Sequence, residues 1–517
     1  MSTASRPMPA RTEVIVIGSG IGGLCCAALS ARAGKEVVVL EAHVHAGGAA
    51  HGFRQQGYHF ESGPSLWSGL GRWPSRNPLA QILRALEQPL EVISYNDWDV
   101  LFPEGHLRIG VGGLGFERVV RRLRGEAVVR EWQQFVSVLE PISAAANALP
   151  LLALPPRMDS VAPLLSRSAR LLPHLSALRH LNGAFGPLVD RHLQDPFLRH
   201  WVDLLCFLIS GMPMAHTNAA AMATLFGEWF EPDASLDYPR GGSAAVVEAL
   251  VRGLQSHGGE LRLGARVARV LLDGDRAIGV ELENGEQIHA DDVVSNADAW
   301  TTAALLPESS ASSWRQKRQS TPACQSFLHL HLGFDASGLE DLPIHTVWVG
   351  DWQRGVDAQG NAVVVSIPSV LDPAMAPQGQ HVLHAYTPAN EPWDRWAGLQ
   401  RGTPAYNHQR QQSCELFWRV LEQRIPDLRS RCRVVMEGTP LTHRHYLNVH
   451  QGSYGPALSA ADGLFPGVMT PIKHLFQCGA SSFPGIGIPP VAASGAMAAH
   501  AIAGSRAQRE LLAMLNL

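Results

Sequence analysis

The stretch EVIVIGSGIGGLCCAALSARAGKEVVVLE, residues 13–41, decides the fold. Its apolar run Val14–Ile17 is β-branched and short, which is typical of a strand buried on both faces. Gly18, Gly20 and Gly23 follow as G-x-G-x-x-G. The first glycine permits a tight turn, the second lets a phosphate group approach the backbone, and the third lets a helix pack closely on the strand. The stretch therefore begins as strand, glycine-rich turn and helix.

The second half of this stretch completes a dinucleotide-binding unit. Residues 21–33 are rich in Ala and Leu and predict a helix, which Gly34 ends as a C-cap. A second strand, 36–40, leads to Glu41, about 20 residues after the glycines, where a carboxylate accepts hydrogen bonds from an adenosine ribose. Because a carboxylate there repels a 2′-phosphate, the pattern predicts FAD or NAD ahead of NADP, with the helix N-terminus facing the phosphates.

The overall composition indicates a large globular protein with reduced thiols. The 517 residues fit two or three packed domains, and a charged fraction of only 17% leaves room for a large apolar interior or cavity. The net charge of −4 gives no sign of nucleic-acid binding. The cysteines include no C-x-x-C pair, which argues for a cytosol-like compartment and against a disulfide scaffold or a zinc site. Residues 1–12 lack the apolar core of a secretory signal.

Two segments bear on membrane contact. The segment Leu204–Gly227 carries no Lys, Arg, Asp or Glu and is long enough to span a bilayer. Because Gly211, Pro213 and Asn218 interrupt it, we expect two buried helical pieces joined by a turn. Residues 161–205 combine apolar positions with repeated Arg and His, which is typical either of a surface resting on a membrane or of a solvated helix face. The sequence leaves both interpretations open.

The remaining pattern predicts an α/β fold with a discontinuous Rossmann-like domain and a second α+β substrate or cap domain. We expect the cofactor domain to comprise residues 11–110, 237–299 and 466–510, the helical cap residues 111–236, and the α+β region residues 300–465. Residues 440–456 are poorly periodic and predict a loop. A ligand would then lie between the two layers, at the carboxyl ends of the parallel strands.

Four blocks of the chain resemble the FAD-dependent phytoene desaturase, carotenoid isomerase and retinol saturase superfamily. They read VIGSGIGGL with Glu41, GGAAHGFRQQGYHFESGPSL, YPRGGSAAVVEALVRGLQSHGGELRLGARVARV through DVVSNAD, and FQCGASSFPGIGIPPVAASGAMAAHAI. The blocks occur in the family's order over nearly the whole chain. Within the superfamily, the likeness is greatest to carotenoid-isomerase-like oxidoreductases of oxygenic phototrophs.

The resemblance implies non-covalent FAD and a set of residues that contact it. It places the ADP half on the first glycines and Glu41, the adenine on the backbone of Val267, and the flavin at the C-terminal motif. The implied cofactor-binding residues are Gly18, Gly20, Ile21, Gly22, Gly23, Glu41, Ala42, Gly47, Gly48, Ala49, Val267, Gly479, Ala480, Gly487, Ile488 and Pro489. Where the family commonly has Gly-Asp, this chain has Gly479-Ala480. Ser481, Ser482 or backbone groups would then replace the carboxylate.

The implied activity is FAD-dependent oxidoreduction of a carotenoid or similar apolar polyene, by desaturation, saturation or redox-neutral cis–trans isomerisation. Such a substrate needs a long apolar tunnel, for which Leu204–Gly227 and four tryptophans are candidate walls. These tryptophans are Trp348, Trp352, Trp393 and Trp396. Two alternatives remain, a flavin amine oxidase and a non-catalytic pigment-binding or assembly protein on the same fold.

No catalytic residue and no metal site is predicted. The pairs His329/His331 and His443/His445 have the i, i+2 spacing of a strand, but two ligands alone do not make a metal site. We expect an apolar small-molecule substrate, no nucleic-acid partner, and a cytoplasmic protein whose membrane contact would be peripheral. The sequence does not define the oligomeric state.

Overall fold

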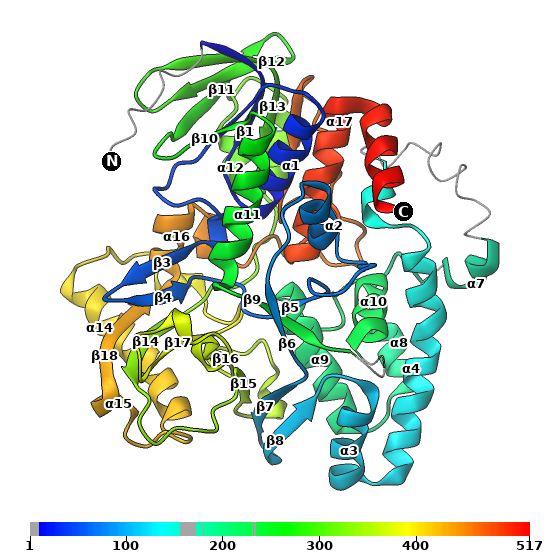
Figure 1. Cartoon of the computed structure of the whole chain (residues 1–517), viewed down its shortest axis with the longest axis vertical. Coiled ribbons are helices and arrows are strands. Elements are labelled where there is room, and N and C mark those ends of the chain that lie inside the picture. Colours follow the sequence, from blue (N-terminus) through cyan, green and yellow to red (C-terminus); the bar gives the residue numbers. More distant parts are fainter. Residues whose placement is uncertain (1–9, 156–171, 179, 230, 232–233) are drawn as a thin grey trace.

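The computed structural model of the protein describes residues 10–155, 172–178, 180–229, 231 and 234–517. The described chain forms two large sheets, one above the other in Figure 1, with a group of helices beside the lower one. Part of the expected basic block, including Arg167, Arg170 and Arg179, lies outside the described residues.

The upper sheet contains the dinucleotide-binding unit and has the strand order β10-β2-β1-β13-β12-β11, with β19 also paired to β13. Its parallel strands are β1 (Arg11–Ile17), β2 (Val37–Leu40), β10 (Glu260–Arg262), β13 (Gln287–Ser295) and β19 (Leu475–Gln477). An antiparallel hairpin, β11 (Val267–Asp273) with β12 (Arg276–Leu282), extends one edge. Three segments far apart in sequence therefore meet in one sheet, as expected of a discontinuous domain.

Small residues let two helices pack closely on this sheet. The helix α1 (Ile21–Arg32) follows β1 directly, and α17 (Ile488–Leu515) returns from the C-terminal end of the chain to lie against it. A Cβ atom placed on Gly495 of α17 would lie 2.2 Å from the carbonyl oxygen of Gly22. The contact therefore has no room for a side chain at this position. The helices α2 (Pro78–Ala85) and α11 (Gly242–Ser256) pack around the same pair.

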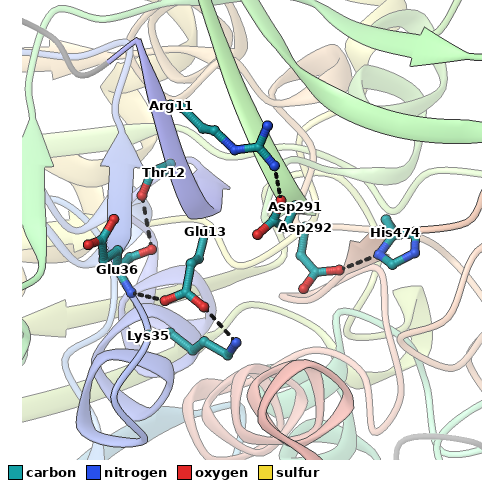
Figure 2. A network of polar contacts seen from close by, with 8 residues as sticks. All are labelled: Arg11, Thr12, Glu13, Lys35, Glu36, Asp291, Asp292 and His474. Carbon is teal, nitrogen blue, oxygen red and sulfur yellow. Dashed lines mark hydrogen bonds and ion pairs between the residues drawn. The ribbon is translucent and has the colours of Figure 1, made fainter.

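Polar contacts join the amino ends of the strands, at the edge opposite the glycine turn (Figure 2). Arg11 of β1 pairs with Asp291 of β13, and the imidazole Nδ1 of His474 lies 2.8 Å from Asp292 Oδ1. Lys35 donates to Glu13 over 2.7 Å, which lowers the pKa of Glu13 and raises the pKa of Lys35. These contacts link the N-terminal, middle and C-terminal segments of the sheet.

The lower sheet has the order β18-β14-β17-β16-β15-β7-β8. Its strands are β7 (Asp97–Phe102), β8 (Gly105–Gly110), β14 (His329–Asp335), β15 (His345–Val349), β16 (Ala362–Ser366), β17 (Gln380–Tyr386) and β18 (Cys432–Gly438). The helices α14 (Pro404–Leu421) and α15 (Leu428–Arg431) pack on it. Residues 11–110, expected to lie wholly in the cofactor domain, thus contribute β7 and β8 to this second sheet, because β7 pairs in parallel with β15.

Short strands connect the two sheets. These are the hairpin β3 (Gly52–Gln55) with β4 (Tyr58–Glu61), and a small sheet of β5 (Trp67–Ser68), β6 (Val92–Tyr95) and β9 (Leu236–Pro239). Glu61 joins β4 to α11, since its buried carboxylate accepts from Ser243 N over 2.8 Å and from Tyr238 Oη over 3.2 Å. Burial raises the pKa of Glu61 to about 7.

The helical cap lies beside the lower sheet (Figure 1). It consists of α3 (Gly113–Arg124), α4 (Glu126–Asn147), α7 (Leu175–Leu178), α8 (Gly186–His192), α9 (Pro196–Ser210) and α10 (Ala219–Trp229). As expected, Leu204–Gly227 forms two helical pieces, and Gly211 ends α9 with a left-handed φ of 71°. Within the described chain one helical segment, Glu126–Ala153, is long and apolar enough to cross a membrane by length and composition alone. It packs on α10.

The prediction of a loop at residues 440–456 is wrong for the first half of that segment. Residues Pro440–Leu447 form the helix α16, and Thr439 caps it by accepting from Thr442 N. The helix lacks a regular apolar stripe, so periodicity does not find it. The threonine N-cap followed by proline was the sequence signal that could have found it. His443 and His445 therefore lie on a helix and not on a strand.

Candidate functional site

One cavity of about 1450 Å³ lies between the two layers, and it begins at the carboxyl ends of β1, β2 and β13. All of the expected cofactor-binding residues line it except Gly23. Gly23 lies inside α1, where an added Cβ would come within 2.3 Å of the carbonyl oxygen of Gly18. It therefore serves the close packing of helix on strand, as the motif predicts.

Asn296 determines how the glycines pack. It follows β13, and its side chain fills the space between the glycine turn and the C-terminal motif. A Cβ atom would lie 2.7 Å from Asn296 Nδ2 if placed on Gly20, and 2.9 Å or 2.8 Å from Asn296 Oδ1 if placed on Gly22 or Gly479. The sequence analysis assigned this residue no role. A polar residue directly after a buried strand was the available signal.

Glu41 is held in place by two neighbouring residues. Its Oε2 accepts from Ser19 N over 2.8 Å and from Ser19 Oγ over 2.6 Å, and its Oε1 accepts from His43 N over 2.8 Å. The carboxylate is half-buried at the end of β2 and lines the cavity. Its position matches that of a ribose-binding acid.

The second glycine pair closes over the first turn. Gly47 N donates to Ser19 O over 3.0 Å, and a Cβ on Gly48 would lie 3.2 Å from Gly20 Cα. Gly47 and Gly48 have φ of 113° and 56°, which side chains rarely adopt. Two glycine turns therefore expose backbone side by side at the N-terminus of α1, a suitable surface for phosphate groups.

The C-terminal motif faces the cavity through backbone and small side chains. Gly479 N donates to Ser494 Oγ over 2.8 Å, while Ala480 lines the cavity. Of the two serines expected to replace the family's carboxylate, Ser481 lines the cavity and Ser482 does not. Ser481 Oγ accepts from Ala299 N over 3.0 Å, which leaves its hydroxyl proton to donate, whereas Ser482 is fully buried. Ser481 and backbone groups are therefore the polar groups that this stretch offers to a ligand.

Beyond this motif the cavity is walled by apolar side chains from the cap. Leu149, Leu151, Leu154, Leu205, Leu208, Ile209, Leu225 and Trp229 line this apolar lobe. The expectation for Leu204–Gly227 as a wall is thus confirmed for several of its residues. The expectation for the four tryptophans was wrong, because none of them lines the cavity. Trp396, for example, is fully buried in the lower sheet's core and donates to Glu391.

Four histidines stack beneath the cavity. His331 and His384 face each other on β14 and β17 with ring centroids 4.3 Å apart, and His329 Nδ1 lies 2.9 Å from His384 Nε2. His443 Nδ1 lies 2.8 Å from the carbonyl oxygen of Gly452, so this nitrogen carries the proton. Burial lowers the pKa of His331 and of His443 to about 4. His329 and His443 line the cavity. The stack is therefore uncharged at neutral pH and compatible with an apolar ligand.

The described residues contain no group of three or more His, Cys, Asp or Glu that could hold a metal ion. Acidic residues also line the cavity on the side of the cap, Glu228 and Glu231 among them. Glu228, near the end of α10, is half-buried, and burial raises its pKa. The cavity thus combines a polar, glycine-lined part at one end with a leucine-rich part at the other.

The dinucleotide-binding motif and the glycine-lined cavity that continues into an apolar lobe are together typical of a flavin-dependent oxidoreductase. Comparison with known proteins supports this assignment. The chain belongs to the family of flavin-containing amine oxidoreductases, whose model matches residues 21–503. It is accordingly an FAD-dependent oxidoreductase.

Among individual proteins, the chain is 30% identical to prolycopene isomerase 1, chloroplastic, of an Oncidium hybrid cultivar, over 95% of this chain and 84% of the relative. It is 26% identical to phytoene desaturase (lycopene-forming) of a Paracoccus species, over 94% of this chain and 96% of the relative. These relatives confirm the resemblance to the carotenoid desaturase and isomerase superfamily. The fold also matches the crystal structure of an oxidoreductase from Methanosarcina mazei, with a TM-score of 0.61 and 18% identity over 93% of this chain and 98% of that one.

Proposed function

We propose that the protein catalyses the redox-neutral cis–trans isomerisation of a linear apolar polyene, with non-covalently bound FAD in its reduced state. The observation that carries this proposal is one continuous cavity, in which a part lined by the dinucleotide-motif residues continues into a leucine-lined lobe. A polyene long enough to fill that lobe would bring one of its double bonds next to the C-terminal glycine motif.

The residues that would hold FAD are those of the cavity's polar part. Glu41 would accept hydrogen bonds from the ribose, Gly20 and Gly48 would border the pyrophosphate, and Gly479 to Pro489 would border the flavin. Once bound, reduced FAD supplies electron density to the polyene. The chain's own contribution is position and exclusion of water, through the apolar lobe on one side and the uncharged histidine stack on the other.

One observation favours isomerisation over net desaturation, and another bears on the amine oxidase alternative. The identity to the named isomerase is 30%, and to the named desaturase it is 26%, over nearly the same share of this chain. A flavin amine oxidase, the alternative suggested by the family's description, needs groups that bind a cationic amine. The leucine-lined walls favour an apolar substrate, and Glu228 and Glu231, which also line the cavity, are the groups that an amine would need.

The test is an anaerobic assay of the holoprotein with a poly-cis carotene in detergent, with the flavin either reduced or oxidised. The products are separated by chromatography, and their masses are measured by mass spectrometry. The proposal expects a change of isomer at unchanged mass, and only with reduced flavin. A product lighter by two hydrogens with oxidised flavin would identify a desaturase. In a separate aerobic assay, peroxide release with amines would identify an amine oxidase, because the peroxide forms when O₂ reoxidises the reduced flavin. Bound pigment without turnover would favour the non-catalytic alternative.

We further propose peripheral contact with the membrane that supplies the substrate. Leu172 and Leu175 are exposed and follow Arg167 and Arg170 closely in the sequence. Their side chains would enter the lipid interface. Sedimentation with anionic liposomes at low salt tests this. If the wild type sediments with the liposomes and the Leu172→Ser/Leu175→Ser variant does not, the contact is supported. If neither the wild type nor the variant sediments, the contact is refuted. The compartment would be one with reduced thiols, since the seven cysteines are all free.

A further inference from the structure

We propose that Asn296 is a cofactor-binding residue, whose side-chain Nδ2 donates a hydrogen bond to the pyrophosphate of FAD. The inference rests on the proposed cofactor site and adds a side-chain donor to it. Asn296 lines the cavity and is half-buried. It lies outside the set of residues that the resemblance implied, and it comes from the middle segment of the discontinuous domain.

Two neighbouring strands fix the backbone around Asn296. Its own N–H donates to the carbonyl oxygen of Ile17, at the end of β1, over 2.9 Å. Cys478 N, directly after β19, donates to the carbonyl oxygen of Ser295, also over 2.9 Å. Because β1 leads into the glycine turn and β19 into the C-terminal motif, the sheet sets the position of Asn296 between these two parts of the site.

The orientation of the amide follows from its neighbours. Oδ1 lies 3.6 Å from Cys478 Sγ, whose S–H donates to it. Burial raises the pKa of the Cys478 thiol well above its ordinary value, so the thiol keeps the proton that it donates. A reversed amide would lose this contact. Nδ2 therefore lies on the side of the glycine turn, 2.7 Å from a Cβ placed on Gly20 and 3.6 Å from one placed on Gly18.

Nδ2 has no hydrogen-bond partner among the residues that the structure describes. It adjoins the N-terminus of α1, whose first N–H groups have no acceptor within the helix and whose N-cap, Gly20, provides no side-chain acceptor. Such a helix end binds phosphate groups, and the second glycine of the motif is where a phosphate approaches the backbone. Nδ2 thus offers a free donor at the point where the motif places the pyrophosphate.

The carboxylate closest to Asn296 in the sequence does not compete for this donor. Asp298 also lines the cavity, but its Oδ1 accepts from Thr301 N over 2.7 Å and its Oδ2 accepts from His450 N over 2.6 Å. Three arginines line the cavity as well, and because they are the same in every variant compared below, their charges do not affect the comparison. They are Arg72, Arg76 and Arg266.

Two roles are possible for Asn296, and an isosteric substitution separates them. If the side chain only fills the space between the two turns, a carboxylate of the same shape should serve as well as the amide. If Nδ2 donates to the pyrophosphate, a carboxylate should be worse than a truncated side chain, because it removes the donor and repels the phosphates. Loss of one hydrogen bond to a charged acceptor corresponds to about 10- to 100-fold in affinity.

The experiment measures FAD dissociation from the holoprotein by the fluorescence of released flavin, at pH 8.0 and low salt. Asn296→Ala should bind FAD about 10- to 100-fold more weakly than the wild type, and Asn296→Asp at least as weakly as Asn296→Ala. The matched control is Asn182→Asp, which introduces the same charge at the cap end of the same cavity and should leave the affinity unchanged.

A second measurement keeps the test valid if Asn296→Asp does not fold, which thermal unfolding of each apoprotein would show. Riboflavin has the flavin ring and ribityl chain of FAD but no phosphate. Asn296→Ala should therefore bind riboflavin as the wild type does. A side chain that only shaped the C-terminal motif would affect riboflavin and FAD alike, since Asn296 Oδ1 also packs against Gly479.

Two results would overturn the proposal. One is a folded Asn296→Asp variant that binds FAD as tightly as the wild type, and the other is an Asn296→Ala variant that loses affinity for riboflavin and for FAD to the same extent. These failures are separable from failure of the proposed function. A protein that binds FAD independently of Asn296 refutes only this inference, and a protein that depends on Asn296 but leaves cis-polyenes unchanged refutes only the isomerase activity.

Discussion

Replacing His500 with leucine should make the protein more stable and less sensitive to acid. His500 lies on α17 and is 5% exposed, and neither ring nitrogen has a hydrogen-bond partner among the residues that the structure describes. A buried polar group without a partner costs about 1–3 kcal/mol. His500→Leu removes that cost and adds apolar contact within the core around α17.

The acid sensitivity can be worked out from the pKa. Burial lowers the pKa of His500 from 6.5 to about 4. Between those values the unfolded chain binds a proton that the folded chain does not, so stability is lost as pH falls below 6.5. From pH 7.5 to pH 5.0 the loss at this one residue is about 2 kcal/mol. The variant should lack this loss, whereas His331 and His345 should still destabilise both the wild type and the variant at acid pH.

The assay is urea unfolding of the wild type and His500→Leu at pH 7.5 and pH 5.0, followed by tryptophan fluorescence. The free energy of unfolding of the variant should exceed that of the wild type by about 1–3 kcal/mol at pH 7.5. At pH 5.0 this difference should be larger by about 2 kcal/mol. His408→Leu is the matched control, because the exposed His408 should leave the pH dependence unchanged. An equal loss of stability with acid in His500→Leu and the wild type would refute the reasoning.

Three further substitutions test the cavity. Glu41→Gln keeps the shape but weakens the contacts with Ser19 and His43, so FAD should bind about 10-fold more weakly in a fluorescence titration, and an unchanged affinity would argue against a ribose contact. Gly22→Val should reduce the flavin absorbance per purified chain to below half, because even a Cβ there lies 2.9 Å from Asn296 Oδ1 and 3.0 Å from Gly479 N. Leu208→Trp fills the apolar lobe, so polyene binding should fall at least 10-fold while flavin content stays constant, and loss of both would mean a damaged fold.

Local pattern predicted residues that line the glycine-rich end of the cavity, and their contact with FAD stays a prediction. The glycine spacing, the strand before it and Glu41 after it all act within one βαβ unit, so their geometry follows from neighbours in sequence. The structure brings Glu41 and Gly48 to the same cavity as Gly479, which the resemblance had implied.

The missed features depend on contacts between distant segments. Asn296 matters because it meets glycines from two ends of the chain, and the histidine stack exists because β14 and β17 pair in a register that places His331 opposite His384. Trp396 looked like a tunnel wall by residue type alone, yet its strand and helix neighbours bury it on the other side of the sheet. Residue type predicts burial, whereas the fold decides which cavity a buried residue faces.

The central claim is that one cavity holds a flavin and a polyene at the same time. The most direct measurement is the visible absorption spectrum of the holoprotein after loading with a cis-polyene and gel filtration, repeated after denaturation to quantify each pigment. The account predicts one FAD and one polyene per chain, with both released on denaturation. A polyene that displaces the flavin, or a chain that carries flavin but never retains polyene, would contradict it.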